Sequence, residues 1–284
     1  MPSFERYNAR GVTLLSDPST VASGVTFAFT ERSGGVSMGP YASLNLGGSC
    51  GDDPASVAEN RRRALAAIGA EQLEERLVNP RQVHGDHVVV VSSSSDESVV
   101  AAQAEARAGS DAVVCTVSDV PLLLCFADCV PVVIVAPGGV AVAHSGWRGT
   151  IVRIAATTAR VLMDATGANA VELCAYIGPH VGMADYKVSP ELAARFSGEF
   201  GAEVVGPDCT LDLGRAVRIA LFDLGLDETQ VVECQDSTAS CTDRFFSYRA
   251  EGGKCGRHGA LAVIGTPWQG WSLAEPAGRQ VTLS

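Results

Sequence analysis

Positive charge is scarce in this sequence of 284 residues. Lysine occurs only at positions 187 and 254, and the formal net charge is −11 at pH 7. An acidic surface repels phosphate backbones, so the composition argues against DNA or RNA as a partner. The one basic run, residues 61–63, lies inside a helical pattern, where a solvated helix face is the ordinary interpretation.

Long apolar runs are also missing. The longest candidate, residues 120–136, is interrupted by Asp128 and Pro131 and falls short of the roughly 18–20 apolar residues that a membrane span requires. Residues 1–23 contain no apolar block flanked by basic residues, which an export signal would need. We therefore expect a cytoplasmic protein with no membrane contact. Because no heptad pattern or long apolar edge is present, we expect a monomer.

Closely spaced cysteine pairs are absent as well. The sequence has nine cysteines, an odd number, and none of them forms a Cys-x-x-Cys pair. Without an export signal a disulfide framework is not expected, and without such pairs a four-thiolate zinc site is not expected either. Most of the cysteines lie in apolar runs, where a small buried hydrophobic residue is the default interpretation.

The sequence does have the composition of a globular protein, since 46% of its residues are hydrophobic and 19% are charged. Hydrophobic periodicity and turn signals predict helices at residues 55–68, 150–165, 190–196 and 212–224. They predict strands at residues 25–30, 88–91, 111–117, 122–126, 132–136, 140–143, 172–177, 231–234, 245–249 and 260–264, and a loop from residue 92 onward.

These elements show no regular strand–helix–strand alternation and no internal repeat, and no linker divides the chain. The pattern therefore predicts one α/β domain of the α+β type, built on mixed β-sheets that helices flank. The domain is expected to occupy residues 1–284, with its core at about residues 25–265.

Three short segments place a metal-ligand side chain beside an apolar strand and next to glycine or proline. They are RQVHG at 81–85, ADCVP at 127–131 and HSGWRG at 144–149. Their ligand side chains are His84, Cys129 and His144. Two imidazoles and one thiolate leave one position of a tetrahedral zinc ion open, which is the pattern of a catalytic site. Asp128 is a candidate to accept a hydrogen bond from a ligand histidine and so fix its tautomer.

With YIGP at 176–179 and FFSYR at 245–249, the sequence resembles the family once called multicopper polyphenol oxidases or laccase-domain proteins. Its members are now regarded as purine nucleoside phosphorylases with adenosine deaminase activity. The resemblance covers residues 25–264 and includes GGVS at 34–37, YASLNLG at 41–47, Asp52-Asp53, Asn60-Arg61 and Gly256-Arg257. It implies a fold similar to that of a bacterial toxin deamidase.

The resemblance also implies a zinc ion bound by His84, Cys129 and His144, and a pocket beside it for adenosine, inosine, guanosine or methylthioadenosine. Asn45, Arg61 and Arg148 match family positions that would line this pocket. A guanidinium fork suits the phosphate dianion, and Arg148 is the first candidate for that role, with Arg61 second. Asn45 would hold the base or ribose.

Asp128, next to the thiolate, counts among the substrate-binding residues of this hypothesis. The catalytic set comprises Cys129, His84, His144 and Arg148.

Three other interpretations stay open. A copper-dependent polyphenol oxidase needs many histidines, but the sequence has five and no His-x-His pair. A hydrolase that edits peptidoglycan precursors could use Cys129 as nucleophile and His144 as base. A partner-binding module without enzymatic activity would expose an apolar groove, and no amphipathic stripe beyond ordinary helices indicates one. Metal content separates the zinc enzyme from the hydrolase, because a thiolate bound to zinc is not a free nucleophile.

Overall fold

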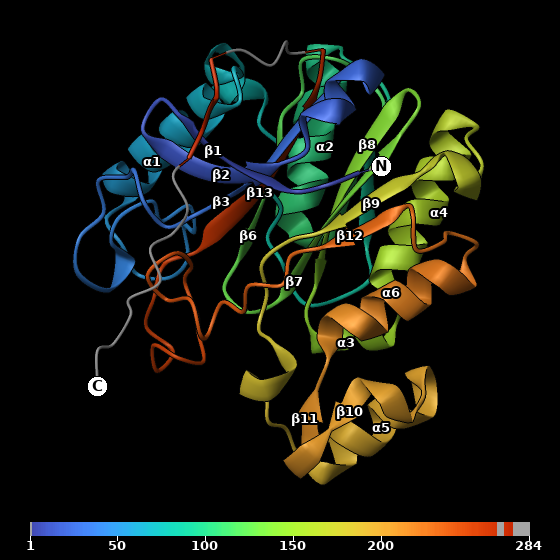
Figure 1. Cartoon of the computed structure of the whole chain (residues 1–284). Helices are drawn as coiled ribbons and strands as arrows, with labels where there is room; N and C mark the ends of the chain where they lie inside the picture. The colour runs from blue at the N-terminus through green and yellow to red at the C-terminus, as the bar shows by residue number, and fades with distance from the viewer. Residues whose placement is uncertain (1, 266–269, 275–284) are drawn as a thin grey trace.

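Two six-stranded sheets stack face to face in the computed structural model, which describes residues 2–265 and 270–274 (Figure 1). Neighbouring strands of the first sheet are all antiparallel. Its order is β14 (Ser272–Leu273), β1 (Glu5–Ala9), β2 (Val12–Ser16), β3 (Val25–Thr30), β13 (His258–Ile264), β6 (Leu122–Phe126).

The second sheet is mixed, with parallel pairs at its two edges and antiparallel pairs between them. Its order is β12 (Val231–Glu233), β9 (Cys174–Ile177), β7 (Val130–Ala136), β8 (Gly139–Ser145), β5 (Ala112–Cys115), β4 (Val88–Val91). Among the described residues, no helix is both long and apolar enough to cross a bilayer.

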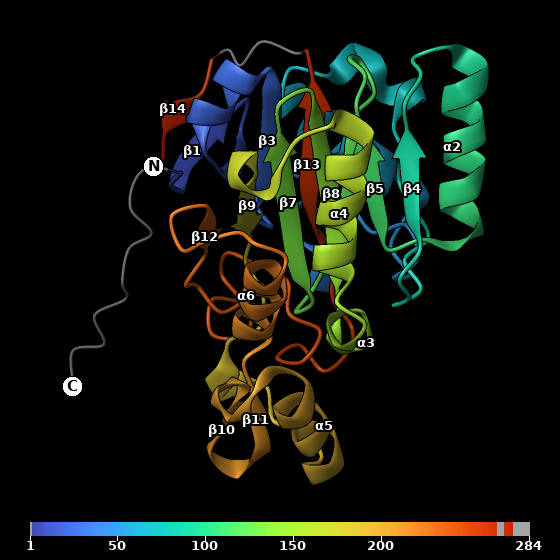
Figure 2. The ribbon, with the colours of Figure 1, turned by 90° about the vertical axis from the view of Figure 1, so that its right-hand side faces the viewer.

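Helices cover the outer faces of both sheets (Figures 1 and 2). The first sheet packs against α1 (Pro54–Ala67), and the second against α4 (Ile154–Thr166) and α6 (Leu213–Asp223). At the β4 edge lies α2 (Asp96–Gly109), and α3 (Trp147–Ile151) follows β8. A small unit of α5 (Pro190–Phe200) with β10 (Val205–Gly206) and β11 (Thr210–Leu211) projects away from the sheets.

Short 3₁₀ helices lie between these helices and strands. They are η1 (Pro18–Ser23), η2 (Gly39–Tyr41), η3 (Glu71–Arg76), η4 (Ala170–Glu172), η5 (Met183–Asp185), η6 (Ala202–Val204) and η7 (Pro207–Cys209).

The continuous apolar runs of the central strands follow from this layering. In β7, Val133 and Val135 point into the core between the two sheets, whereas Val132 and Ile134 point into the core under α4 and α6. Because alternate side chains of a strand face opposite sides, a strand covered on both faces is apolar at every position. The mixed α/β single domain predicted from the sequence is thus confirmed.

Helix ends also follow local signals. The Asp53 carboxylate accepts hydrogen bonds from the amides of Ala55 and Ser56, and Pro54 takes the first helical position of α1, as its sequence predicts. The helix predicted over residues 150–165 is instead divided into α3 and α4. Arg153 adopts a left-handed φ of 57° between them, which no helix continues through.

Two of the predicted elements were wrong. Residues 245–249 form a loop and not a strand. The loop packs on the sheets, and this packing, without strand pairing, buries Phe245 and Phe246. The loop predicted after residue 92 contains α2, whose N-terminus is capped by Ser95. This helix joins β4 to the parallel strand β5 and so forms one strand–helix–strand unit. The hairpin of β1 and β2 precedes residue 25 and adds two strands to the first sheet.

Candidate metal centre

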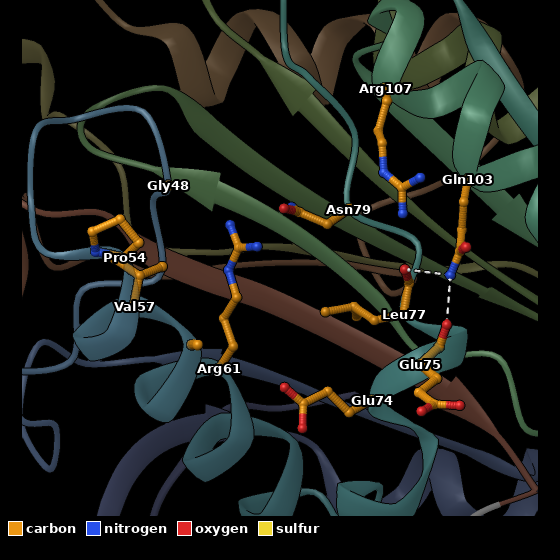
Figure 3. A pocket seen from close by; sticks show the side chains of 11 residues that line it. Gly48, Pro54, Val57, Arg61, Glu74, Glu75, Leu77, Asn79, Gln103 and Arg107 are labelled. Carbon is orange, nitrogen blue, oxygen red and sulfur yellow. Dashed lines mark hydrogen bonds between the residues drawn. The ribbon is translucent and has the colours of Figure 1, made fainter.

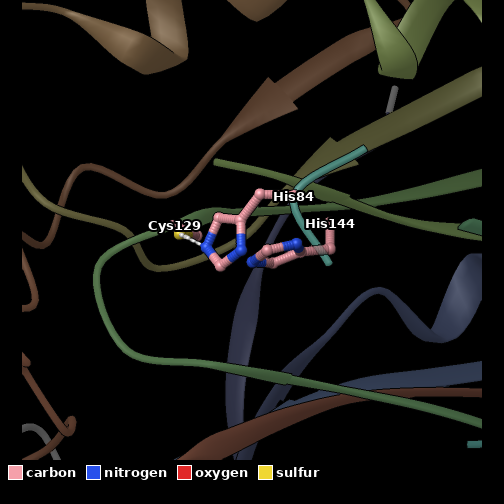
Figure 4. A group of neighbouring side chains, drawn as sticks. All are labelled: His84, Cys129 and His144. Atoms are coloured by element: carbon pink, nitrogen blue, oxygen red, sulfur yellow. Dashed lines mark hydrogen bonds between the residues drawn. The ribbon is translucent and has the colours of Figure 1, made fainter. Parts of the chain in front are cut away.

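Three side chains from distant segments meet where the strands of the two sheets end. The candidate ligand atoms of His84, Cys129 and His144 all lie within 4.8 Å of one another (Figure 4). Cys129 belongs to the link that leaves β6 in the first sheet and enters β7 in the second. His144 is near the end of β8, which pairs with the start of β7, so the pairing of these strands brings the imidazole to the thiol. His84 reaches the same point from the loop before β4.

Asp111 holds two of these ligands in place. Its carboxylate is fully buried and accepts a hydrogen bond of 2.8 Å from Nδ1 of His144. It also accepts hydrogen bonds from the backbone amides of Val83, His84 and Gly85, and so fixes the loop in which His84 adopts a φ of 60°. When Nδ1 of His144 carries the proton that it donates to Asp111, Nε2 presents its lone pair to a metal ion.

The charge on Asp111 is retained although the residue is buried. Burial opposes its ionisation, but the hydrogen bond from His144 and those from the backbone amides outweigh burial and lower the pKa of Asp111. No local pattern indicated this role, since Asp111 stands at the start of an ordinary apolar strand.

Asp128, which we expected to orient a ligand histidine, has a different set of partners. It accepts hydrogen bonds from the hydroxyl groups of Thr238 and Ser247 and from the backbone amide of Arg249. That expectation was wrong, and Asp111 takes the role. Asp128, the residue before Cys129, is instead hydrogen-bonded to Ser247 and Arg249 and so holds the FFSYR segment beside the thiol.

The charge state of the thiol follows from its neighbours. Burial opposes ionisation of Cys129, but the His144 imidazole, together with His84, outweighs burial and lowers the pKa of the thiol to about 6. The thiolate in turn helps to raise the pKa of His144, with Asp111, against the opposing effect of burial. Cys129 is therefore ready near neutral pH to bind a soft metal ion or to act as a nucleophile.

The donor set fits a zinc ion. With Zn–S of about 2.3 Å and Zn–N of about 2.0–2.1 Å, tetrahedral angles place sulfur and nitrogen about 3.5 Å apart. Sγ of Cys129 lies 3.8 Å from Nε2 of His84, and the two imidazole rings meet edge to face with centroids 4.8 Å apart. The three residues also line a cleft, so a fourth coordination position would be open to a substrate.

The cleft that contains this centre has a volume of about 750 Å³. Arginines are its dominant charged residues: Arg61, Arg81, Arg107, Arg249 and Arg257. Within the described residues, none of them forms an ion pair with a carboxylate, whereas Arg32, Arg153 and Arg244 elsewhere do. Unneutralised guanidinium groups around a cavity favour an anionic ligand.

A family model described as multi-copper polyphenol oxidoreductase laccase matches residues 26–265. The chain belongs to this laccase family. A protein of Deinococcus radiodurans named purine nucleoside phosphorylase is 37% identical to it over 91% of this chain and 95% of that protein. The purine nucleoside phosphorylase YlmD of Geobacillus stearothermophilus is 34% identical over 93% of this chain and 98% of that protein.

Two solved structures have the same fold. The crystal structure of the hypothetical protein YfiH of Bacillus licheniformis superposes with a TM-score of 0.80 at 26% identity, covering 91% of this chain and 98% of that one. The crystal structure of YlmD from Geobacillus stearothermophilus gives 0.76 at 30% identity, covering 90% and 97%.

The copper chemistry in the laccase family's description needs more histidines than this site has. His87 binds Glu105 at the surface, His180 binds the carbonyl of Gly178, and His258 is buried between Phe126 and Phe245. Over residues 2–265 and 270–274, His84, Cys129 and His144 are the one group that could hold a metal ion. A multicopper cluster therefore lacks its ligands in this member of the laccase family.

The other expected site residues lie in different places. Arg61 lines the cleft. Asn45 is fully buried and does not line it, but its amide supports residues that do. Arg148 is exposed, its guanidinium carbon lies 5.1 Å from the ring centroid of Trp147, and it is not among the lining residues.

Sequence reasoning missed most of the cleft arginines. Arg81, Arg249 and Arg257 stand inside motifs that carry the family resemblance, next to residues that we did single out. Their position in these motifs was the available signal.

Position 146 has room only for a glycine, because the candidate ligands His84 and Cys129 lie against it. A Cβ atom at this position would stand 2.7 Å from Cδ2 of His84 and 3.1 Å from Sγ of Cys129. We expect Gly146→Ala to displace both ligands and to weaken zinc binding about 10–100-fold, as other changes to ligand orientation do. Competition with a chelator of known affinity measures this change. Gly198→Ala on α5, where a Cβ meets no atom within 4 Å, is the control, and equal affinities of the two variants would contradict the prediction.

Proposed function

We propose that this protein is a zinc-dependent purine nucleoside phosphorylase that also deaminates adenosine. The observation that carries the proposal is the centre of His84, Cys129 and His144, which opens into a cleft lined by arginines without carboxylate partners. The names of the relatives from Deinococcus radiodurans and Geobacillus stearothermophilus support it. Adenosine, inosine, guanosine and methylthioadenosine are the substrates we propose.

Phosphorolysis makes use of the charges in this cleft. An oxygen of hydrogen phosphate forms a bond to C1′ of the ribose, and the bond from C1′ to the purine nitrogen breaks. The electron pair of that bond stays on the purine, which takes the proton of hydrogen phosphate, and ribose 1-phosphate forms. Guanidinium groups hold the phosphate dianion in place and stabilise charge as it moves to the leaving base.

Three aromatic side chains in the same cleft could stack on the purine. Trp147, Tyr186 and Tyr248 line it, and the guanidinium carbon of Arg249 lies 4.7 Å from the ring centroid of Tyr186. Aromatic rings stack on a purine face regardless of its substituents, which suits a substrate range of several nucleosides. For deamination, in which water replaces the amino group of adenosine and ammonia leaves, a bound zinc ion supplies a Lewis acid that lowers the pKa of water.

Metal analysis followed by product analysis tests the proposal. The protein is purified without added metal, its metal content is determined, and it is incubated with adenosine with and without phosphate. We expect about one zinc ion per chain, as a three-ligand catalytic site binds, and release of adenine only when phosphate is present. Inosine among the products would establish deamination. A zinc-free protein that leaves adenosine unchanged would reject the proposal.

A second candidate function is a hydrolase acting on amide bonds of peptidoglycan precursors. It is favoured by one observation: Asp111, His144 and Cys129 form a chain of the kind that activates a thiol nucleophile, and the pKa of Cys129 is lowered to about 6. Amide hydrolysis that survives a chelator but is abolished by alkylation of Cys129 would support this function. Loss of all activity with the metal would reject it.

A further inference from the structure

We propose that inorganic phosphate binds where residues 47–49, Arg61 and Arg257 line the cleft, and not at Arg148. The assignment rests on the proposed phosphorylase function and names the place of its second substrate. Gly47, Gly48 and Ser49, here called the 47–49 loop, line the same cleft as the metal ligands. Phosphate bound there and a nucleoside next to the metal centre would share one continuous space, as transfer of the ribosyl group requires.

The buried side-chain amide of Asn45 connects the residues that form this end of the cleft. Oδ1 of Asn45 accepts hydrogen bonds from the backbone amides of Gly47, at 3.0 Å, and Arg257, at 2.8 Å. Its Nδ2 donates to Asp52, a carboxylate that does not line the cleft. One fully buried side chain therefore joins the loop to the backbone of an arginine more than two hundred residues later in the chain. This explains why an asparagine that does not itself line the cleft belongs to the family resemblance.

Gly47 leaves room for Arg257, and Gly48 lies at ordinary contact distance from Arg61. A Cβ atom on Gly47 would stand 2.6 Å from Cγ of Arg257, and one on Gly48 would stand 3.4 Å from a terminal nitrogen of Arg61. Bare backbone thus lies beside both side chains. Within residues 2–265 and 270–274, the amides of Gly48 and Ser49 donate to no protein acceptor, so they are available to an oxyanion.

Both guanidinium groups are anchored through part of their N–H groups. Nε of Arg61 donates to the carbonyl of Leu46 at 2.9 Å. One terminal nitrogen of Arg257 donates to the carbonyls of Cys255 and Gly256, and its guanidinium carbon lies 5.7 Å from the ring centroid of Tyr248. The remaining N–H groups have no carboxylate partner among the described residues. Two anchored forks and two backbone amides match a tetrahedral dianion, which has acceptor oxygens on every side.

The adjoining pocket of about 460 Å³ is a weaker place for phosphate (Figure 3). It shares Gly48, Arg61 and Arg107 with the cleft, but Glu74 and Glu75 also line it. Carboxylates there would repel a dianion, which favours the 47–49 loop.

The test compares Arg61→Gln and Arg257→Gln with the control Arg160→Gln, an exposed arginine on α4 that does not line the cleft. We expect each cleft variant to raise the KM for phosphate about 10–100-fold, because each loses charged hydrogen bonds to the dianion. Deamination of adenosine, which needs no phosphate, should lose less activity in these variants than phosphorolysis does, and Arg160→Gln should change neither reaction. Arg257→Lys, which keeps the charge without the fork, should fall between wild type and Arg257→Gln.

Direct binding separates this assignment from the proposed function. Titration of the zinc-loaded wild type with inorganic phosphate, followed by calorimetry, reads the subsite without turnover. If the wild type binds phosphate and Arg61→Gln and Arg257→Gln do not, the subsite is supported. This holds even if no nucleoside is cleaved, and in that case only the proposed function fails. Nucleoside cleavage with an unchanged KM for phosphate in Arg61→Gln and in every folded Arg257 variant would overturn the subsite.

Discussion

Replacing Cys129 by alanine should abolish zinc binding and phosphate-dependent cleavage of adenosine together. The variant removes the one thiolate of a three-ligand centre and leaves two imidazoles, which hold zinc far less tightly. Since loss of a residue that merely orients a ligand costs about 10–100-fold in affinity, loss of a ligand should exceed 100-fold, that is, about 3 kcal/mol. Metal content after gel filtration and adenine release measured on the same sample check this result.

A second cysteine serves as the control. Cys174→Ala changes a half-buried thiol on β9 that does not line the cleft, and it should leave zinc content and turnover unchanged. A Cys129→Ala protein that turned over adenosine at the wild-type rate without metal would end the metal hypothesis. A variant that kept its zinc but lost all activity would shift the weight to Cys129 as a nucleophile.

Asp111 is not a candidate ligand, but Asp111→Asn should still weaken metal binding. An amide side chain must turn its NH₂ group toward either His144 or the backbone amides of the His84 loop, so that donor faces donor. We expect zinc affinity to fall about 10–100-fold. We also expect the free energy of unfolding to fall by about 1–3 kcal/mol, because a buried donor loses its acceptor. Denaturant unfolding and chelator competition measure the two changes.

Asp17→Asn separates the two effects. Asp17 is also buried, and its carboxylate accepts hydrogen bonds from the backbone amides of Ser3 and Ser19 and from the hydroxyl of Tyr176, outside the cleft. This variant should lose stability but keep the zinc affinity of the wild type. If both asparagine variants bound zinc equally well, Asp111 would have a structural role alone.

The net charge of the chain and the charge of its cleft have opposite signs. A formal net charge of −11 argues against nucleic acid, yet the cleft is lined by arginines without carboxylate partners. Because interactions between exposed charges are screened within about 10 Å in physiological salt, a small anion in the cleft responds to its nearest guanidinium groups. An acidic protein can therefore bind phosphate at a local basic site.

Much of the fold was readable from local sequence patterns. The central strands are apolar at every position because both of their faces are covered, and Asp53-Pro54 marks the start of α1 through its own hydrogen bonds. The three candidate ligands stood in motifs whose order resembles that of the laccase family, and the structure brings these three side chains together.

The tertiary structure alone decided what surrounds these ligands. Asp111 contacts His144, 33 residues further along the chain, and it binds amides of a loop 26–28 residues before it. The cleft arginines come from segments that meet only when the two sheets stack. Periodicity and turn signals record the surroundings of neighbouring residues, whereas a side chain's hydrogen-bond partner depends on which distant backbone passes beside it. For that reason the sequence singled out the three candidate ligands, and only the folded chain showed that Asp111, not Asp128, accepts hydrogen bonds from His144 and from the backbone of His84.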